Sequence, residues 1–144
     1  MCDFGVSAKL VNSLASTYVG TQKYMSPERI DGGQPYGAQS DVWSLGISLM
    51  EMVTSSCPYP EWDAPGSSLF KRMLLITKTG PRPIRDLLQS GVDQDLCDLL
   101  GQCLRMVPEQ RPMHATLRSH PFIERHAHTD ISEWASQLIE KTLM

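Results

Sequence analysis

The sequence predicts a mainly helical protein with one long loop at its N-terminal end. Apolar residues recur at helical spacing in several segments after residue 40, and no stretch alternates convincingly between apolar and polar residues. Residues 6–26 are rich in serine and threonine and contain no acidic residue, which is typical of a loop. A helical core behind a polar N-terminal loop is therefore the expected architecture.

The central element is predicted to be a helix over Ser40–Thr54. Ser40 is a favourable N-cap residue, and Asp41 suits the positive end of a helix dipole. The segment is apolar nearly all round, which is typical of a helix in the centre of a domain. We therefore expect it to be the most buried element, with Val42, Leu45 and Leu49 away from water.

Shorter helices are predicted on either side. Pro27 opens a helical turn that ends at residues 31–33, and a second helix runs from about Ser68 to Lys78, where residues 80–83 break it. A third helix starts near Asp93 and ends before Pro108, with one apolar stripe formed by Leu96, Leu99, Leu100, Cys103 and Leu104. A short helix near His114–Ser119 and a last one over Ile131–Leu143 complete the chain.

Composition excludes several classes of function. The 144 residues make about one domain, and the net charge of −3 gives no field that favours nucleic acid or an anionic membrane as partner. No apolar run approaches the ~20 residues of a membrane span, and Met1 is not followed by an apolar signal core. None of the four cysteines forms a Cys-x-x-Cys pair, so we expect a reduced, cytoplasmic protein without a disulfide framework.

Ordered motifs suggest a family. Asp3-Phe4-Gly5 is followed by "SPERI" at 26–30, "SDVWSLG" at 40–46, "PEQRP" at 108–112 and "HPFI" at 120–123. This set resembles the C-terminal lobe of a eukaryotic protein kinase, although Ser26 stands where the general pattern has alanine. The resemblance implies an incomplete kinase domain over 1–125, with an activation segment at 3–28 and a helical lobe at 29–125, and a C-terminal extension over 126–144.

The segment before Ile30 narrows the resemblance. Together, "DFGVS", "SLAST", "VGTQKYMSPERI" and "SDVWSLGISLMEM" resemble the MAP kinase kinases, and Tyr24 and Met25 are adjacent where related upstream kinases carry an intervening tryptophan. The resemblance implies a dual-specificity enzyme that transfers the ATP γ-phosphate to Thr and Tyr of a MAP kinase. It also implies an upstream partner, a MAP kinase kinase kinase. A Ser/Thr kinase of a neighbouring family is the alternative.

The resemblance also implies roles for residues of the N-terminal loop. Asp3 would hold Mg²⁺ beside ATP, whereas outside this context it is a turn-forming aspartate. Phe4 and Gly5 would complete the motif, and Cys2 would face the nucleotide or be a small buried apolar residue. The resemblance further implies that Ser13 and Thr17 are regulatory phosphosites and that Gly20 and Thr21 bind the protein substrate. A plain polar loop is the alternative, and Ser16 lies between the two phosphosites.

Structural residues are implied as well. Glu28 and Arg111, 83 residues apart, resemble a buried ion pair that ties the end of the segment to the lobe. Asp41 resembles the aspartate that holds the backbone of the catalytic loop, although stabilisation of the helix dipole alone would also explain it. The three histidines His120, His126 and His128 are not predicted to bind metal, because no fourth ligand stands nearby.

The last helix places Ile131, Trp134 and Leu138 on one face. It resembles the docking helix by which MAP kinase kinases bind the kinase above them, and the alternative is a closing helix packed on its own lobe. The 144 residues show no Gly-rich loop, nucleotide-binding lysine, His-Arg-Asp loop or catalytic asparagine. We therefore expect this chain alone to be inactive, and a non-catalytic interaction module that binds cascade partners is the alternative function.

Overall fold

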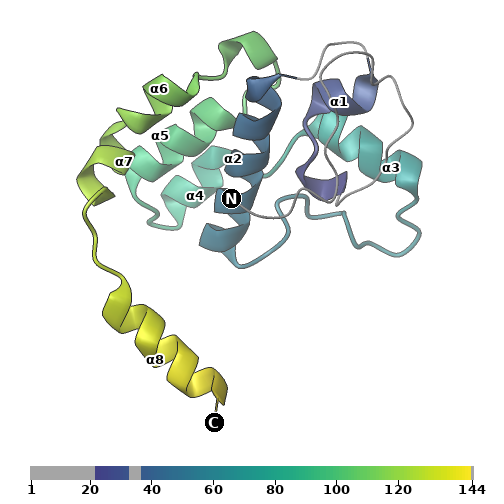
Figure 1. The fold of residues 1–144 in the computed structure, drawn as a ribbon. Coiled ribbons are helices and arrows are strands. Elements are labelled where there is room, and N and C mark those ends of the chain that lie inside the picture. Colours follow the sequence, from purple (N-terminus) through teal and green to yellow (C-terminus); the bar gives the residue numbers. More distant parts are fainter. Residues whose placement is uncertain (1–21, 33–36, 144) are drawn as a thin grey trace.

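A computed structural model of the chain describes residues 22–32 and 37–143. Within these two ranges the chain forms helices joined by turns and loops, with no strand, in agreement with the predicted fold class (Figure 1). The elements are η1 Gln22–Tyr24, α1 Pro27–Asp31, α2 Ala38–Thr54, α3 Leu69–Leu74, a π-helical turn η2 Leu75–Thr79, α4 Ile84–Gln89, α5 Gln94–Cys103, η3 Pro108–Gln110, α6 His114–Arg118, α7 Pro121–His126 and α8 Ser132–Leu143.

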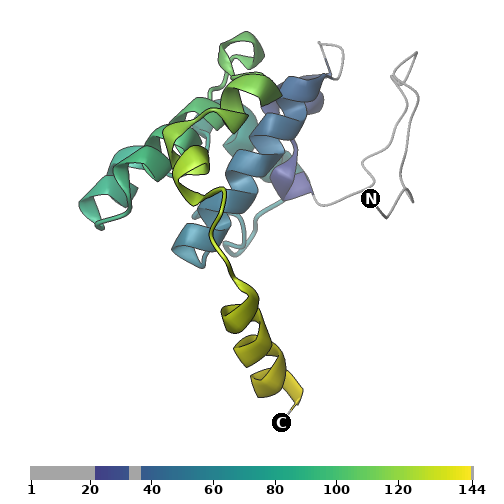
Figure 2. The same cartoon turned by 60° about the vertical axis from the view of Figure 1, so that its left-hand side comes forward.

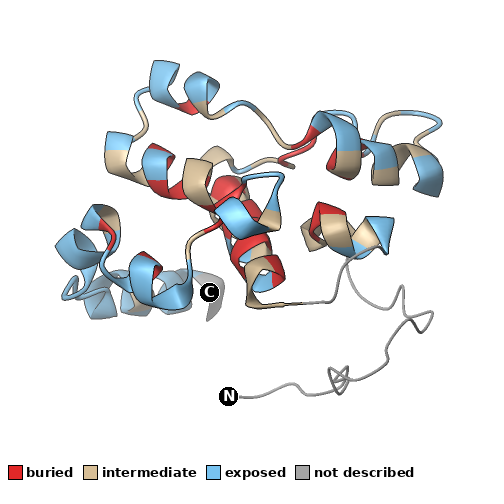
Figure 3. Ribbon diagram, turned by 90° about the horizontal axis from the view of Figure 1, so that it is seen from above, coloured by how far each residue is buried: buried red, intermediate tan, exposed pale blue. Residues whose placement is uncertain are grey.

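Helix α2 is the centre of the fold, with α4 to α7 on one side of it and α1 and α3 on the other (Figure 1). The buried residues gather on α2 and on the faces that the other helices turn toward it (Figure 3). Trp43, Ile47 and Met50 of α2 are fully excluded from solvent, and Leu100 and Cys103 of α5 are as well. The longest predicted helix therefore carries much of the core.

One face of α2 departs from the prediction. Leu45 is 45% exposed and Met52 is 76% exposed, whereas Val42 is buried and Leu49 is half-buried. The expectation that Leu45 lies away from water is therefore wrong, because within the described residues no element covers this side of α2. An apolar circumference identifies a helix that can be buried on every face, but burial depends on what packs against each face.

The start of α2 also differs from the prediction. The helix begins at Ala38 with Gly37 as its N-cap residue, so Ser40 lies inside the first turn and does not cap it. The Ser40 hydroxyl instead donates a hydrogen bond to Glu28, 2.7 Å away. Serine is a favourable N-cap residue, but Ser40 lies after the first residue of the helix, and its hydroxyl makes a tertiary contact.

Two other helix starts lie where the sequence placed them. The Ser68 hydroxyl accepts a hydrogen bond from the Lys71 N–H at the start of α3, and the Asp93 carboxylate accepts one from the Leu96 N–H at the start of α5. Helices α4 and α7 were not predicted. Each has six residues, which is too short for apolar periodicity to be recognised in the sequence.

Helices α2 and α5 approach one another closely at Gly46. A Cβ atom on Gly46 would lie 2.8 Å from Cβ of Cys103 and 2.8 Å from Cδ2 of Leu104. Gly46→Ala is therefore expected to lower the free energy of unfolding by about 1–3 kcal/mol through overpacking. This loss is expected even though alanine has a helix propensity about 1 kcal/mol more favourable than glycine.

Gly101→Ala on α5 is the matched control, because the nearest atom to a Cβ there is Cγ1 of Ile84, 4.0 Å away. This variant gains helix propensity without a clash and is expected to raise the free energy of unfolding by about 0.5–1 kcal/mol. Urea denaturation of both variants measures the two effects. A Gly46→Ala variant that is as stable as Gly101→Ala would contradict the close packing of α2 against α5.

The last helix, α8, extends away from the rest of the molecule (Figures 1 and 2). Four of its flanking and internal apolar side chains are at least half exposed: Ile131, Trp134, Leu138 and Ile139. The arrangement in which α8 packs on its own lobe is therefore not the one observed. Among the described helices, none is long and apolar enough to cross a bilayer.

Candidate functional site

The structure describes only part of the predicted site. The following assigned residues all lie outside the described residues: Cys2, Asp3, Phe4, Gly5, Ser13, Thr17, Gly20 and Thr21. What the structure does describe is the end of the predicted activation segment, residues 22–28, and the face of α2 on which it rests. We call residues 22–28 the segment end.

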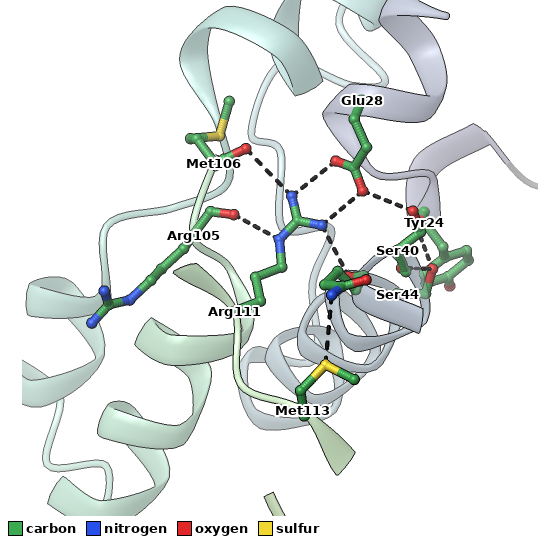
Figure 4. Close-up of polar contacts among 9 residues, drawn as sticks. Tyr24, Glu28, Ser40, Ser44, Arg105, Met106, Arg111 and Met113 are labelled. Atoms are coloured by element: carbon green, nitrogen blue, oxygen red, sulfur yellow. Dashed lines mark hydrogen bonds and ion pairs between the residues drawn. The ribbon is translucent and has the colours of Figure 1, made fainter. Parts of the chain in front are cut away.

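The most buried ion pair of the segment end joins Glu28 of α1 to Arg111, which follows η3. The guanidinium Nη1 donates to Oε1 of Glu28 at 2.8 Å, and Nη2 donates to Oε2 at 2.9 Å (Figure 4). This is a two-bond contact between planar groups, the geometry that arginine forms and lysine cannot. The predicted contact between these residues is therefore present in the structure.

Arg111 also organises the backbone around it. Its side chain is fully buried, and Nε donates to the carbonyl of Arg105 at 2.7 Å while Nη1 donates to the carbonyl of Gln39 at 2.9 Å (Figure 4). A longer bond from Nη2 reaches the carbonyl of Met106 at 3.4 Å. All five N–H groups of the guanidinium thus have acceptors, so burial leaves none of them unsatisfied.

An aromatic ring completes the surroundings of Arg111. The guanidinium carbon lies 5.0 Å from the ring centroid of Trp43, which is fully buried on α2. A cation over a tryptophan ring in a desolvated site is stabilised by the ring quadrupole. The charged pair is therefore set directly on the hydrophobic core and connects α1, α2 and the turn after η3.

The charge state of Glu28 follows from these contacts. Burial would raise the pKa of Glu28, but the hydrogen bonds from Arg111 and Ser40 outweigh it and lower the pKa from its ordinary value of 4.5 to about 2. The carboxylate side chain is 8% exposed. Glu28 is therefore ionised at every pH at which the protein is expected to work, and the ion pair is permanent.

The rest of the segment end lies along a polar stripe of α2. Ser40, Ser44 and Glu51 share one face of the helix, since their spacing brings them back to nearly the same angle. The Ser44 hydroxyl donates to the carbonyl of Tyr24 at 2.8 Å. The carboxylate of Glu51 accepts hydrogen bonds from the side chains of Lys23 and Tyr24. The segment end is therefore held at several points by one face of one helix.

These contacts include residues that sequence reasoning did not assign. The sequence analysis assigns no role to Ser44, Glu51 or the hydroxyl of Tyr24. Each partner is 20 or more residues away in the chain. The sequence does contain a signal for this polar face. Ser40, Ser44, Ser48 and Glu51 recur at helical spacing and interrupt the apolar surface of α2 on one side.

His120 has a structural role at the start of α7. Its ring Nδ1 accepts a hydrogen bond from the Phe122 N–H at 3.3 Å, and its Nε2 lies 3.2 Å from Oδ2 of Asp98. The side chain is buried and serves as the N-cap of α7. Within the described residues no cluster of three or more metal-binding side chains is found.

Asp41 lies in the first turn of α2 and is exposed. This position is compatible with stabilisation of the helix dipole. Its implied role, holding the backbone of a catalytic loop, involves a loop that these 144 residues do not show, and it remains a prediction.

Comparison of the sequence with known proteins identifies the family. The sequence model of the protein kinase domain matches residues 1–123. The chain belongs to the protein kinase family. The Glu28–Arg111 contact and helix α2 lie within the matched residues, so they belong to a part of a kinase domain.

The proteins that this chain resembles include MAP kinase kinases. The chain is 39% identical over 98% of its length to MAP kinase kinase PBS2 of Saccharomyces cerevisiae and 34% identical over 98% to protein kinase wis1 of Schizosaccharomyces pombe. It is 34% identical over 97% to the dual specificity mitogen-activated protein kinase kinase dSOR1 of Drosophila melanogaster. The chain spans 21%, 24% and 40% of these relatives, respectively.

Proposed function

We propose that the complete protein is a dual-specificity MAP kinase kinase. It would transfer the γ-phosphate of ATP to Thr and Tyr of a MAP kinase. A MAP kinase kinase kinase would be the upstream kinase that activates it. The observation that carries this proposal is the 34–39% identity to MAP kinase kinases and related protein kinases over nearly the whole chain. The predicted cytoplasmic location belongs to the same proposal.

Residues of the N-terminal loop would serve the nucleotide and the substrate. Asp3 would hold Mg²⁺ with Cys2, Phe4 and Gly5 beside it, and a carboxylate is the ligand type that this hard cation prefers. Magnesium bound with ATP supplies positive charge next to the phosphates. Gly20 and Thr21 would contact the protein substrate, and the Glu28–Arg111 pair would hold the segment end behind them.

The test is a chimera that joins residues 1–144 to the upstream part of the kinase domain of dSOR1. With ATP and Mg²⁺, this chimera is expected to phosphorylate a MAP kinase on both Thr and Tyr. Residues 1–144 alone are expected to transfer no phosphate, since they show no Gly-rich loop and no catalytic loop. Mass spectrometry of the substrate identifies the modified residues.

Asp3→Asn in the chimera is the matched control, and it is expected to lower the rate by about 100-fold or more because one metal ligand is lost. A chimera that melts cooperatively but labels only Ser or Thr of other proteins would favour the neighbouring kinase family. Phosphate incorporation by residues 1–144 alone, abolished by Asp3→Asn, would overturn the expectation that this chain is inactive.

A second function, binding to cascade partners, is favoured by α8. Its apolar face is exposed, with Ile131 59%, Trp134 62% and Leu138 50% accessible, and the helix is separated from the lobe (Figures 1 and 2). An amphipathic helix of this kind fits a hydrophobic groove on a partner. We propose that the partner is the MAP kinase kinase kinase and that these three residues enter its groove. Residues 126–144 would then be an extension that follows the kinase domain of residues 1–125.

Trp134→Ala tests this docking role. In the full chain it is expected to weaken binding to a MAP kinase kinase kinase by about tenfold or more, because buried tryptophans dominate interface energies. Glu140→Gln, on the opposite face of α8, is the control and should leave the affinity within about twofold. Isothermal titration calorimetry measures both. Equal affinities for Trp134→Ala and the unchanged chain would exclude α8 as the docking helix.

A further inference from the structure

Three side chains meet where the segment end reaches α2. Nζ of Lys23 lies 2.5 Å from Oε1 of Glu51, and the Tyr24 hydroxyl donates to Oε2 of Glu51 at 2.5 Å. Nζ of Lys23 also lies 4.9 Å from the centroid of the Tyr24 ring. Both carboxylate oxygens of Glu51 are therefore occupied by two consecutive residues, and the three side chains contact one another.

The backbone is held at the same place. The Ser44 hydroxyl donates to the carbonyl of Tyr24 at 2.8 Å, and the Met25 N–H donates to the carbonyl of Gln22 at 3.0 Å. The turn Gln22–Met25 is thus fixed to α2 through both side chains and backbone. The hydrogen bonds of the Lys23–Glu51 contact raise the pKa of Lys23 and lower the pKa of Glu51, so both groups stay charged.

The energy of this contact is small compared with that of folding. The side chains of Lys23 and Glu51 are 17% and 30% exposed, and ion pairs that water reaches contribute little to stability. The lobe already has the fully buried Arg111 to secure α1. The partly exposed pair therefore fixes the position of the turn on α2 and is not needed for the lobe to fold.

We propose that Lys23 is a positioning residue for the protein substrate, which acts by fixing the turn Gln22–Met25 on Glu51. The inference rests on the proposed function, in which Gly20 and Thr21, just before this turn in the sequence, contact the MAP kinase. Lys23 touches no reacting group. Its loss lets the turn move, and the substrate is then bound less well while ATP binding is unaffected.

The first experiment uses the chimera described above and four variants of it. Lys23→Gln and Glu51→Gln are each expected to raise KM for the MAP kinase by about tenfold, because small displacements of a positioning segment cost this much. The KM for ATP should stay unchanged, and Lys23→Arg should restore KM for the MAP kinase to within about twofold. The double variant should be no worse than either single one, since both remove the same contact.

Lys71→Gln is the matched control, because it also removes a lysine from a Lys–Glu contact, that with Glu61 at 3.3 Å, far from the segment end in the sequence. The proposal is overturned if Lys23→Gln behaves like Lys71→Gln. It is also overturned if kcat, KM for ATP and KM for the MAP kinase all deteriorate together, since that is the result of a general structural loss.

The second experiment separates this proposal from the proposed function. Hydrogen exchange of residues 1–144 follows the amide of Met25, whose acceptor is the Gln22 carbonyl. Lys23→Gln should speed its exchange by about tenfold while amides of α5 are unchanged, and Lys71→Gln should not. If the chimera is inactive, the proposed function fails, and this exchange still tests whether Lys23 fixes the turn Gln22–Met25. Unchanged exchange at Met25 in Lys23→Gln overturns the positioning role.

Discussion

Replacing Arg111 by methionine is expected to lower the free energy of unfolding by about 3–5 kcal/mol, because it leaves the carboxylate of Glu28 buried without its charged partner. The side chain of Arg111 is fully buried and that of Glu28 is 8% exposed, so water cannot replace the lost bonds. Arg111→Lys keeps the charge but cannot form two parallel bonds to the carboxylate. We expect it to cost about 1–3 kcal/mol.

Arg125→Met is the matched control. Arg125 also forms ion pairs, with Asp93 and Asp95, but its side chain is 48% exposed. Exposed pairs contribute about 0–1 kcal/mol, so this variant should be close to the unchanged chain. Urea denaturation of the three variants measures the free energies. An Arg111→Lys variant that unfolds at the same urea concentration as the unchanged chain would contradict the buried pair.

The same pair is expected to make stability depend on pH in the acid range. The folded pKa of Glu28 is about 2 and its ordinary value is 4.5. A depressed carboxyl pKa gives stability that is fully present above the ordinary value and is lost as the pH falls toward the folded value. This difference of pKa corresponds to a contribution on the order of 3 kcal/mol.

Glu28→Gln removes this titration and gives the comparison. The variant is less stable near neutral pH, and the stability difference from the unchanged chain should shrink as the pH is lowered from about 4.5 to about 2. Exposed carboxylates such as Asp93 titrate in both proteins and cancel in the difference. A stability difference that stays constant over this range would show that the pKa of Glu28 is not depressed.

Ser13→Ala and Thr17→Ala are each expected to reduce activation of the chimera by an upstream kinase by about tenfold or more. Both residues precede the segment end, whose final residues are fixed by the Glu28–Arg111 and Ser44–Tyr24 contacts. Phosphate groups would recruit cations and order the loop that leads to this fixed point. Residues 6–26 contain no acidic side chain, so the added charge meets no repulsion from within the loop.

Ser16→Ala is the matched control, because it removes a neighbouring hydroxyl of the same loop and should leave activation unchanged. Activity toward a MAP kinase is measured for each variant after treatment with the upstream kinase. If Ser16→Ala alone abolishes activation while Ser13→Ala and Thr17→Ala do not, the assignment of the phosphosites is wrong.

Local signals in the sequence were sufficient for several features of this protein. Ser68 and Asp93 start helices because capping uses only neighbouring backbone groups, so the signal and its effect lie within one turn. The Glu28–Arg111 contact spans 83 residues, and it was predictable only because the order of motifs resembles that of a known family. Family membership thus came from motif order rather than from any single tripeptide.

Tertiary structure decided the rest. Ser40 has the chemistry of an N-cap, yet α2 begins two residues earlier, at Ala38, and the Ser40 hydroxyl donates to the Glu28 carboxylate of another helix. Leu45 and Met52 look like core residues and are exposed, whereas Ile47 is buried. Residue type states what a side chain can do, and only the packing of distant elements decides which partner it meets. For the same reason the polar spacing along α2 marks Glu51 in the sequence, but only the packing of the segment end on α2 makes Lys23 its partner.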